Sequence, residues 1–108
     1  MKIYSLDQFT GGWFIGDFEP SIFRNNTFEV SVKNFSKGSK EPLHFQNIAT
    51  EITIVCKGKI LICKQMLNAG EIIEIEPQES CDFEALEDSI LVCIKYPSIP
   101  QDKIVINN

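Results

Sequence analysis

Three side chains that could bind a ligand or transfer a proton lie close together near the middle of the chain: His44, Gln46 and Glu51. Alternate side chains of a β-strand point to the same face, so His44 and Gln46 would share one face. A turn directly after Gln46 would bring Glu51 back on the neighbouring strand, facing the first two. An imidazole, an amide and a carboxylate together can bind hydroxyl groups, hold a cation or move a proton. We therefore expect a ligand pocket in this stretch, which begins at Gly38 and ends at Gly58.

The composition and charge of the chain limit what it can bind. Of its 108 residues, 44% are apolar and 23% charged, which is typical of a globular chain, and we expect one domain over residues 1–108. The formal net charge is −5 and the isoelectric point about 4.8, and the lysines are scattered among acidic residues. Because phosphate backbones are bound by clustered Lys and Arg, we expect no nucleic-acid partner.

The N-terminal segment and the cysteines bear on the compartment. The segment MKIYSLDQFTGGW lacks the apolar region of a signal peptide, and no apolar run is long enough to span a membrane. We therefore expect a cytoplasmic protein with no membrane partner. The four cysteines, Cys56, Cys63, Cys81 and Cys93, show no CxxC spacing, so free thiols are expected. A disulfide between adjacent strands stays open as the alternative.

Short strands separated by turn signals follow one another along most of the chain. Polar and apolar residues alternate in residues 27–35, which is typical of a half-buried strand, and apolar runs occupy 51–56 and 90–96. Lys57-Gly58 between two such runs suits a type I′ hairpin turn. No segment has a sustained helical period, so the sequence predicts an all-β sandwich or barrel. Several strands are apolar on both faces, which predicts that a second sheet or a partner subunit covers the outer one.

The spacing of five residues resembles the first sequence motif of the cupin superfamily. That motif has the form G, five residues, HxH, three or four residues, E, six residues, G. Gly38, His44, Glu51 and Gly58 match it at every spacing, and Gln46 stands in place of the second His.

A second, degenerate match to the cupin pattern runs from Gly70 to Ala85. Glu76 stands at its proline position, Cys81 falls where a third His is found, and Ala85 replaces an Asn. Together the two motifs cover about 38–58 and 70–85, and the chain is similar to small single-domain, RmlC-like cupins. The resemblance implies an antiparallel double-stranded β-helix, that is, a jelly-roll barrel.

The resemblance also implies a site for one divalent cation. In metal-binding cupins the two His of HxH, the Glu and the later His hold the ion, and the matching positions here are His44, Gln46, Glu51 and Cys81. An imidazole and a carboxylate are good ligands for Fe, Mn, Ni or Zn, whereas an amide oxygen is weak and Cys81 binds only as a thiolate. Two interpretations stay open: a metal site with a mixed ligand set, or a decayed one whose cavity persists.

Three hypotheses about function follow. The first is a homodimer that binds a small molecule in the barrel, a sugar or nucleotide-sugar derivative, with proton transfer by His44 oriented by Glu51 if it is catalytic. The second is a metal-dependent isomerase, epimerase or dioxygenase. The third is a structural module whose interior is filled by Phe28, Phe45 or Phe83. The candidate ligand-binding residues are His44, Gln46, Glu51, Cys81, Lys33 and Phe83.

Several other side chains could contribute to ligand binding. Arg24 and Lys40, like Lys33, could meet an anionic substrate group, although ordinary surface charge is the simpler interpretation. Trp13 could stack on a sugar, and Tyr96 could act as an acid in sugar isomerisation. Cys81 as a nucleophile would need a base nearby, and His44 is the candidate.

Overall fold

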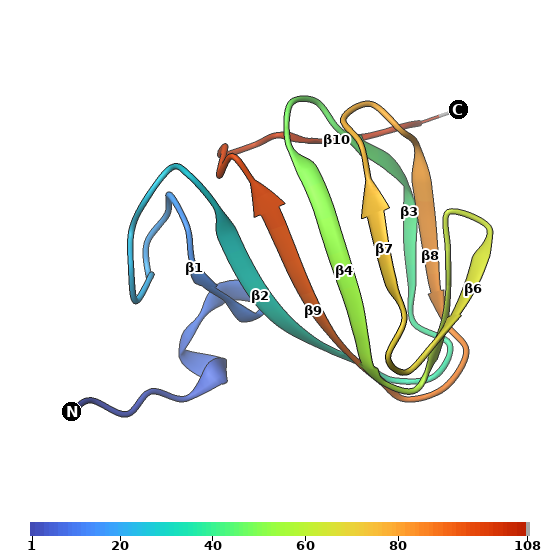
Figure 1. Cartoon of the computed structure of the whole chain (residues 1–108), viewed down its shortest axis with the longest axis horizontal. Coiled ribbons are helices and arrows are strands. Elements are labelled where there is room, and N and C mark those ends of the chain that lie inside the picture. The colour runs from blue at the N-terminus through green and yellow to red at the C-terminus, as the bar shows by residue number, and fades with distance from the viewer. Residues whose placement is uncertain (108) are drawn as a thin grey trace.

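The structure is a computed structural model that describes residues 1–107, and these form two five-stranded sheets (Figure 1). Their elements are two short 3₁₀ helices, η1 (Leu6–Gln8) and η2 (Thr10–Gly12), and the strands β1 (Trp13–Ile15), β2 (Glu29–Phe35), β3 (Lys40–Gln46), β4 (Thr50–Lys57), β5 (Lys59–Ile62), β6 (Gln65–Asn68), β7 (Ile72–Ile75), β8 (Cys81–Ala85), β9 (Ser89–Tyr96) and β10 (Lys103–Val105). In this part of the chain, no helix has the length and hydropathy needed to cross a membrane.

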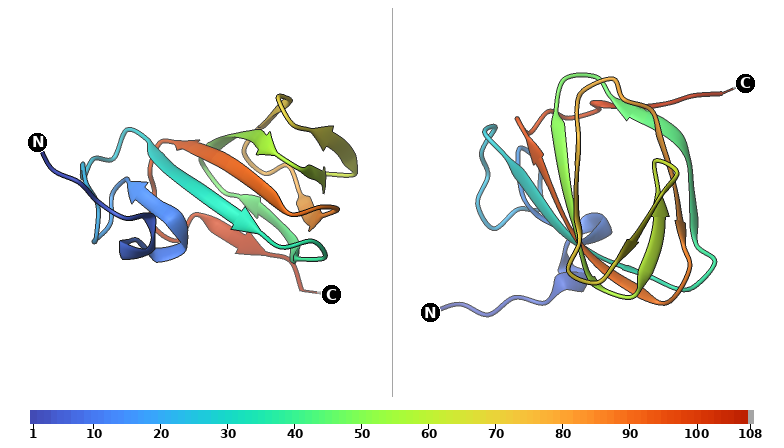
Figure 2. Two further views of the ribbon diagram at one scale, coloured as in Figure 1. Left: turned by 90° about the horizontal axis from the view of Figure 1, so that it is seen from below. Right: turned by 45° about the vertical axis from the view of Figure 1, so that its right-hand side comes forward.

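From β3 onward the chain passes repeatedly between the two sheets. One sheet has the order β1-β2-β9-β4-β7, the other β10-β3-β8-β5-β6, and the neighbouring strands are antiparallel. The two sheets form opposite walls of a barrel-like body (Figure 2). This is the double-stranded β-helix, and the predicted all-β, antiparallel fold is confirmed.

Two local predictions about turns are wrong, for the same reason. β4 lies in the opposite sheet from β3, so Glu51 faces the first motif residues from across the barrel and not from a neighbouring strand. Gly58 likewise carries the chain from β4 into the other sheet, and no hairpin forms there. The two-residue hairpin joins β5 to β6, where Cys63 and Lys64 have φ of 49° and 62°, the left-handed pair that a type I′ turn requires.

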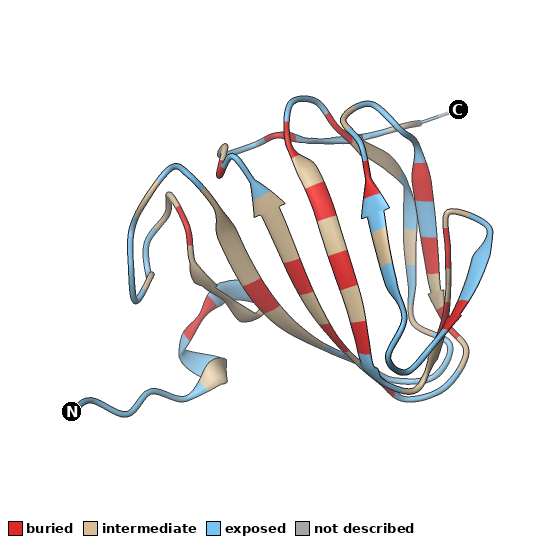
Figure 3. Cartoon of the chain, viewed as in Figure 1, coloured by how far each residue is buried: buried red, intermediate tan, exposed pale blue. Residues whose placement is uncertain are grey.

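The inner face of the first sheet becomes less polar from one end to the other. Across β2, β9 and β4, residues in register share a face, and the row at one end is Glu29, Lys95 and Glu51. The next row is Ser31, Cys93 and Thr53, and the third is Lys33, Leu91 and Val55. Buried residues alternate with half-buried ones along β4, as Figure 3 shows. Charged side chains therefore occupy the whole of the first row, and Lys33 is the one charged residue of the third row.

The apolar core fills the rest of the interior. It brings together Val55, Ile60, Ile62, Leu67, Ile75, Cys81, Phe83, Ala85 and Leu91, from both sheets. Phe83 stacks on Phe35 with ring centroids 4.6 Å apart. Removing this much apolar surface from water supplies the main driving force for closing the barrel.

The half-buried strand predicted at residues 27–35 turns its polar side inward. Glu29, Ser31 and Lys33 face the barrel interior, whereas Val30 and Val32 lie on the outer face. The usual arrangement of a two-layer β protein is the opposite. The inward-facing polar side chains of β2 therefore need hydrogen-bond or ionic partners inside the barrel. The outward-facing valines leave an apolar surface on the outside of the first sheet.

The two glycines that bound the first motif differ in their surroundings, which gives a matched pair of substitutions. Both have φ near +90°, but a Cβ on Gly58 would lie 2.9 Å from Ser89 Cα, whereas a Cβ on Gly38 would meet nothing within 4 Å. We expect Gly38→Ala to lower the free energy of unfolding by about 1–2 kcal/mol, from the backbone conformation alone. Gly58→Ala should cost roughly 3 kcal/mol or more, since the clash adds to that strain. Urea denaturation measures both; equal losses would contradict the packing at Gly58.

Candidate functional site

A cavity of about 120 Å³ lies between the two sheets, and every ligand-binding residue predicted from the sequence lines it. The residues come from β2, β3, β4 and β8, so both sheets contribute. They are His44, Gln46, Glu51, Cys81, Lys33 and Phe83. The first-motif side chains His44, Gln46 and Glu51 thus line one cavity from both sheets.

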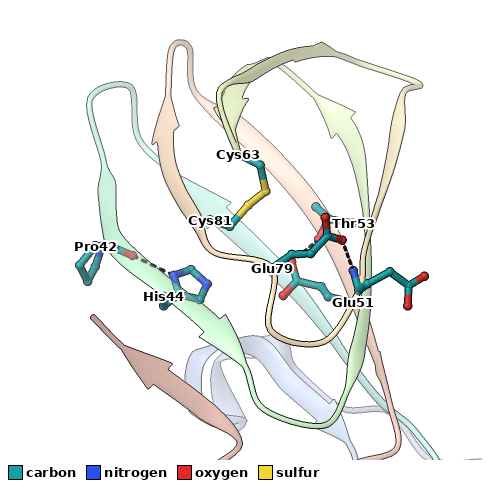
Figure 4. The surroundings of a disulfide bond; sticks show 8 residues. Pro42, His44, Glu51, Thr53, Cys63, Glu79 and Cys81 are labelled. Atoms are coloured by element: carbon teal, nitrogen blue, oxygen red, sulfur yellow. Dashed lines mark hydrogen bonds between the residues drawn. A yellow bond between two sulfur atoms is a disulfide. The ribbon is translucent and has the colours of Figure 1, made fainter. Parts of the chain in front are cut away.

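His44 on β3 has its tautomer set by the backbone. Its Nδ1 lies 2.8 Å from the carbonyl oxygen of Pro42, which can only accept a hydrogen bond, so Nδ1 carries the proton (Figure 4). In the neutral ring the other nitrogen, Nε2, is then an acceptor. His44 can therefore accept a proton or a hydrogen bond from a group in the cavity.

Glu51 on β4 is held by a neighbour on its own strand. Its side chain is 9% exposed, and Oε2 accepts a hydrogen bond of 2.8 Å from the hydroxyl of Thr53. The same hydroxyl lies 3.7 Å from the sulfur of Cys93. The carboxylate is fixed in orientation while Oε1 remains available to a ligand.

Gln46, at the end of β3, carries an acceptor without a partner. The residue is 4% exposed, and its Oε1 is buried with no hydrogen bond to any described residue. A buried polar atom left without a partner costs about 1–3 kcal/mol, so such atoms are rare. The amide also lines a second cavity, of about 330 Å³, that adjoins the first. A ligand with a hydrogen-bond donor would satisfy this oxygen.

Cys81 does not have the role predicted for it. It is bonded to Cys63, which sits in the β5–β6 turn, as Figure 4 shows. The expectation of free thiols is therefore wrong for this pair, though Cys56 and Cys93 are free. A disulfide sulfur has no thiolate to offer, so Cys81 can serve neither as a metal ligand nor as a nucleophile. Sequence spacing could not reveal the pairing, because it depends on how β5 lies against β8.

Other predicted side chains lie away from the cavity. Arg24 is exposed and forms ion pairs with Asp17 and Glu19. Tyr96 is exposed at the end of β9, with its side chain on the outer face, and Lys40 is exposed at the start of β3. Of the phenylalanines proposed to fill the interior, Phe83 contributes to the core but leaves the cavity open.

Several residues that line the cavity were not identified in this role from the sequence. Lys95 and Lys103 line both cavities, and Glu41, also at the first cavity, pairs with Lys103 at 3.1 Å. Trp13, which was considered only as a stacking residue, has the ammonium groups of both Lys33 and Lys95 over its ring. The alternation of side chains along β9 could have predicted that Lys95 points into the barrel, because Lys95 lies on the same face of the strand as Cys93 and Leu91.

Comparison with known proteins identifies the fold. No protein-family model matches the sequence, and the search of curated proteins gives no match. An uncharacterized conserved protein with a double-stranded beta-helix domain from Klebsiella pneumoniae matches with a TM-score of 0.73 at 17% identity, over 99% of this chain and 93% of that one. The chain therefore belongs to the class of double-stranded β-helix folds.

A narrower comparison agrees with the motif spacing. An RmlC-like cupin from Shewanella frigidimarina matches with a TM-score of 0.64 at 18% identity, over 72% of each chain. The fold of this chain is thus similar to that of RmlC-like cupins. A bacterial pirin, YhhW from Escherichia coli, solved in complex with nickel(II), also matches, with a TM-score of 0.66 at 14% identity, over 81% of this chain and 39% of that one.

The donors of this chain fit a metal ion poorly. Residues 1–107 contain no group of three or more His, Cys, Asp or Glu side chains placed to hold one. Of the four positions that the cupin resemblance implies, Cys81 is in a disulfide and Gln46 offers only a neutral amide. Divalent transition metals bind best to several imidazole, thiolate or carboxylate ligands. His44 and Glu51 alone do not make such a set.

The remaining thiols should differ in reactivity. Burial raises the pKa of the Cys93 thiol to about 12, so at pH 8 it is almost wholly protonated and unreactive, whereas Cys56 is exposed. We expect a disulfide-exchange reagent such as Ellman's reagent to label one thiol rapidly in the native, unreduced protein. Cys56→Ser should abolish that reaction and Cys93→Ser should leave it unchanged.

Denaturation provides the control for this count. In urea without reductant two thiols should react, and after reduction and removal of the reductant all four should react. Two rapid equivalents in the native protein would contradict the burial of Cys93, and four would contradict the Cys63–Cys81 bond.

Proposed function

We propose that the chain binds a small polar molecule in the barrel interior, between His44 and Gln46 on one sheet and Glu51 on the other. The buried, unpartnered oxygen of Gln46 is the observation that carries this proposal. An interior with no ligand to bind would favour an apolar residue at this position, because the lone acceptor destabilises the fold. A hydroxyl group donating to Gln46 Oε1 would remove that cost.

The cavity sizes favour a sugar-like molecule over a nucleotide sugar. A cavity of about 120 Å³ is on the order of four water volumes. Drug-sized ligands usually occupy ~300–1,000 Å³. The adjoining cavity of about 330 Å³ shares Trp13, Gln46 and Lys95 with the first, so a longer molecule could extend into it. A polyhydroxylated chain or ring with one end in the inner cavity suits this shape.

If the chain is an enzyme, its residues best support proton transfer. His44 Nε2 and the free oxygen of Glu51 approach the cavity from opposite sheets. Such a pair could remove a proton from one side of a carbon or hydroxyl and return one on the other, as sugar isomerisation or epimerisation requires. Glu51 needs no reorganisation for this, because Thr53 holds it.

The binding proposal is tested by Gln46→Leu. Trp13 is the single tryptophan and lines both cavities, so its fluorescence should report on binding. We expect at least one member of a panel of monosaccharides, sugar alcohols and aldonic acids to bind at millimolar concentration or below. Gln46→Leu should weaken that binding about tenfold, the value of roughly one hydrogen bond to a buried group. It should also raise the free energy of unfolding of the unliganded protein.

Gln65→Leu is the matched control, because Gln65 is exposed on β6 and lines neither cavity. It should leave ligand affinity unchanged. Binding that is equally tight in Gln46→Leu and the parent would overturn the proposal, and so would a panel of which no member binds.

The metal-dependent alternative remains the second candidate, with less support. The fold is shared with a nickel-bound pirin, but the donors here are few. Elemental analysis of purified protein and titration with Fe(II), Mn(II), Ni(II) and Zn(II) test it. Stoichiometric metal with micromolar affinity that is lost in His44→Ala would favour this alternative.

We further propose that the partner is a second copy of the chain. The outer face of the first sheet carries apolar side chains that a single chain leaves half-buried: Val30, Val32, Ile52, Ile54, Ile90, Val92 and Ile94. A twofold axis through this face would place the same apolar surface against itself, which is the usual arrangement of homodimers. This accounts for strands that are apolar outside and partly polar inside.

Val92→Lys tests the dimer, since Val92 lies at the centre of this face between Val32 and Ile54. We expect the parent to sediment as a dimer and Val92→Lys as a folded monomer, because a buried ammonium group is costly. Gln65→Lys, on the exposed β6 strand of the other sheet, is the control and should stay dimeric. A monomeric parent would contradict the proposal.

A further inference from the structure

Two lysine ammonium groups lie over the ring of Trp13, and all three residues line the inner cavity. Lys33 Nζ lies 5.1 Å and Lys95 Nζ 4.9 Å from the centre of the Trp13 ring. Lys33 on β2 and Lys95 on β9 both line the cavity. Cation–π contact stabilises each ammonium group by about 0.5–2 kcal/mol, but it does not neutralise the charge.

Neither ammonium group is paired with a carboxylate. The ion pairs of residues 1–107 involve Arg24 and Lys103, and none includes Lys33 or Lys95 at 4.0 Å or less. Lys33 Nζ donates to the carbonyl oxygen of Gly11 at 2.9 Å, which is a neutral acceptor. Burial lowers the pKa of Lys33, which shows that its surroundings disfavour the charge. Neither ammonium group is therefore in direct contact with a carboxylate of the described residues, although Glu41 is close enough to oppose the lowering of the pKa of Lys33.

The nearby acids are engaged elsewhere. Lys95 stands in register between Glu29 and Glu51, yet its ammonium group lies over Trp13. Glu29 accepts a hydrogen bond from Ser98 at 2.9 Å, and Glu51 accepts one from Thr53. Glu41 is paired with Lys103. An anion from outside that enters the cavity beside Trp13 would therefore find two ammonium groups without a carboxylate in direct contact.

We infer that the molecule bound in the barrel is a small hydroxy acid, whose carboxylate is bound by Lys33 and Lys95 beside Trp13 and whose hydroxyl group donates to Gln46. This rests on the proposed binding function and names the chemical class of its ligand. Gln46 lines the same cavity and has the orphaned acceptor, so one molecule can satisfy both features. A monoanion suits the site better than a phosphate dianion, because Glu41 and Glu51 also line the cavity and would repel a second negative charge.

The test compares D-gluconate with D-sorbitol, which differ only in the carboxylate that replaces one CH₂OH group. Calorimetry and Trp13 fluorescence measure both affinities. We expect gluconate to bind at least tenfold more tightly than sorbitol at low salt, with the difference reduced in 0.5 M NaCl. Lys33→Met and Lys95→Met should each remove most of this preference, and Lys33→Arg should retain much of it. Circular dichroism checks that each variant is folded.

Lys37→Met is the control, because Lys37 is exposed and lines neither cavity; it should keep the full preference for gluconate. If gluconate and sorbitol bind equally tightly, and Gln46→Leu still weakens the binding of both, the proposed carboxylate site is overturned but the proposed binding function is not. Tighter binding of sorbitol 6-phosphate than of gluconate would overturn the choice of a carboxylate. No binding of any of the three, together with an inactive sugar panel, would remove the proposed function as well.

Discussion

The register of β2, β9 and β4 is the constraint on which the rest of the structure depends. It places Glu29, Lys95 and Glu51 in one inward-facing row and Lys33, Leu91 and Val55 in another. Because side chains alternate, a slip of one residue would send the charged row to the outer face and bring valines and isoleucines inside. The apolar core at one end holds this register in place. Because the core fixes the register, it also fixes which side chains of the same strands face inward at the other end. Those side chains line the polar cavity.

Much of the fold was predictable because its signals are local or have fixed spacing. Alternation in 27–35 and turn residues between short runs indicated strands, and the spacing from Gly38 to Gly58 indicated the jelly roll. The sequence also identified His44, Gln46 and Glu51, which line one cavity. It failed where a turn was taken to join neighbouring strands. In a double-stranded β-helix many connections cross between sheets, so the partner of a strand is set by distant residues, as β4 shows by pairing with β7 and β9.

The unpredicted parts of the site are all products of such long-range pairing. Lys95 comes within reach of Trp13 because β9 lies beside β2, and β2 beside β1. Lys103 reaches the cavity because β10 pairs with β3. Cys63 meets Cys81 because β5 and β8 are neighbours, although 18 positions separate them in sequence. No window of sequence contains both members of any of these pairs, so a local pattern could not identify them.

The replacements in the cupin pattern have a common electrostatic consequence. The resemblance implied a cation held by four side chains, of which Gln46 is neutral and Cys81 is committed to a disulfide. The same cavity receives the ammonium groups of Lys33 and Lys95. At a separation of several ångströms, a divalent ion and a lysine repel one another, and the repulsion grows as water is excluded. Lysine side chains of the chain itself therefore bring positive charge to this cavity. Under the proposed binding of a hydroxy acid, these ammonium groups would hold the carboxylate without a metal ion.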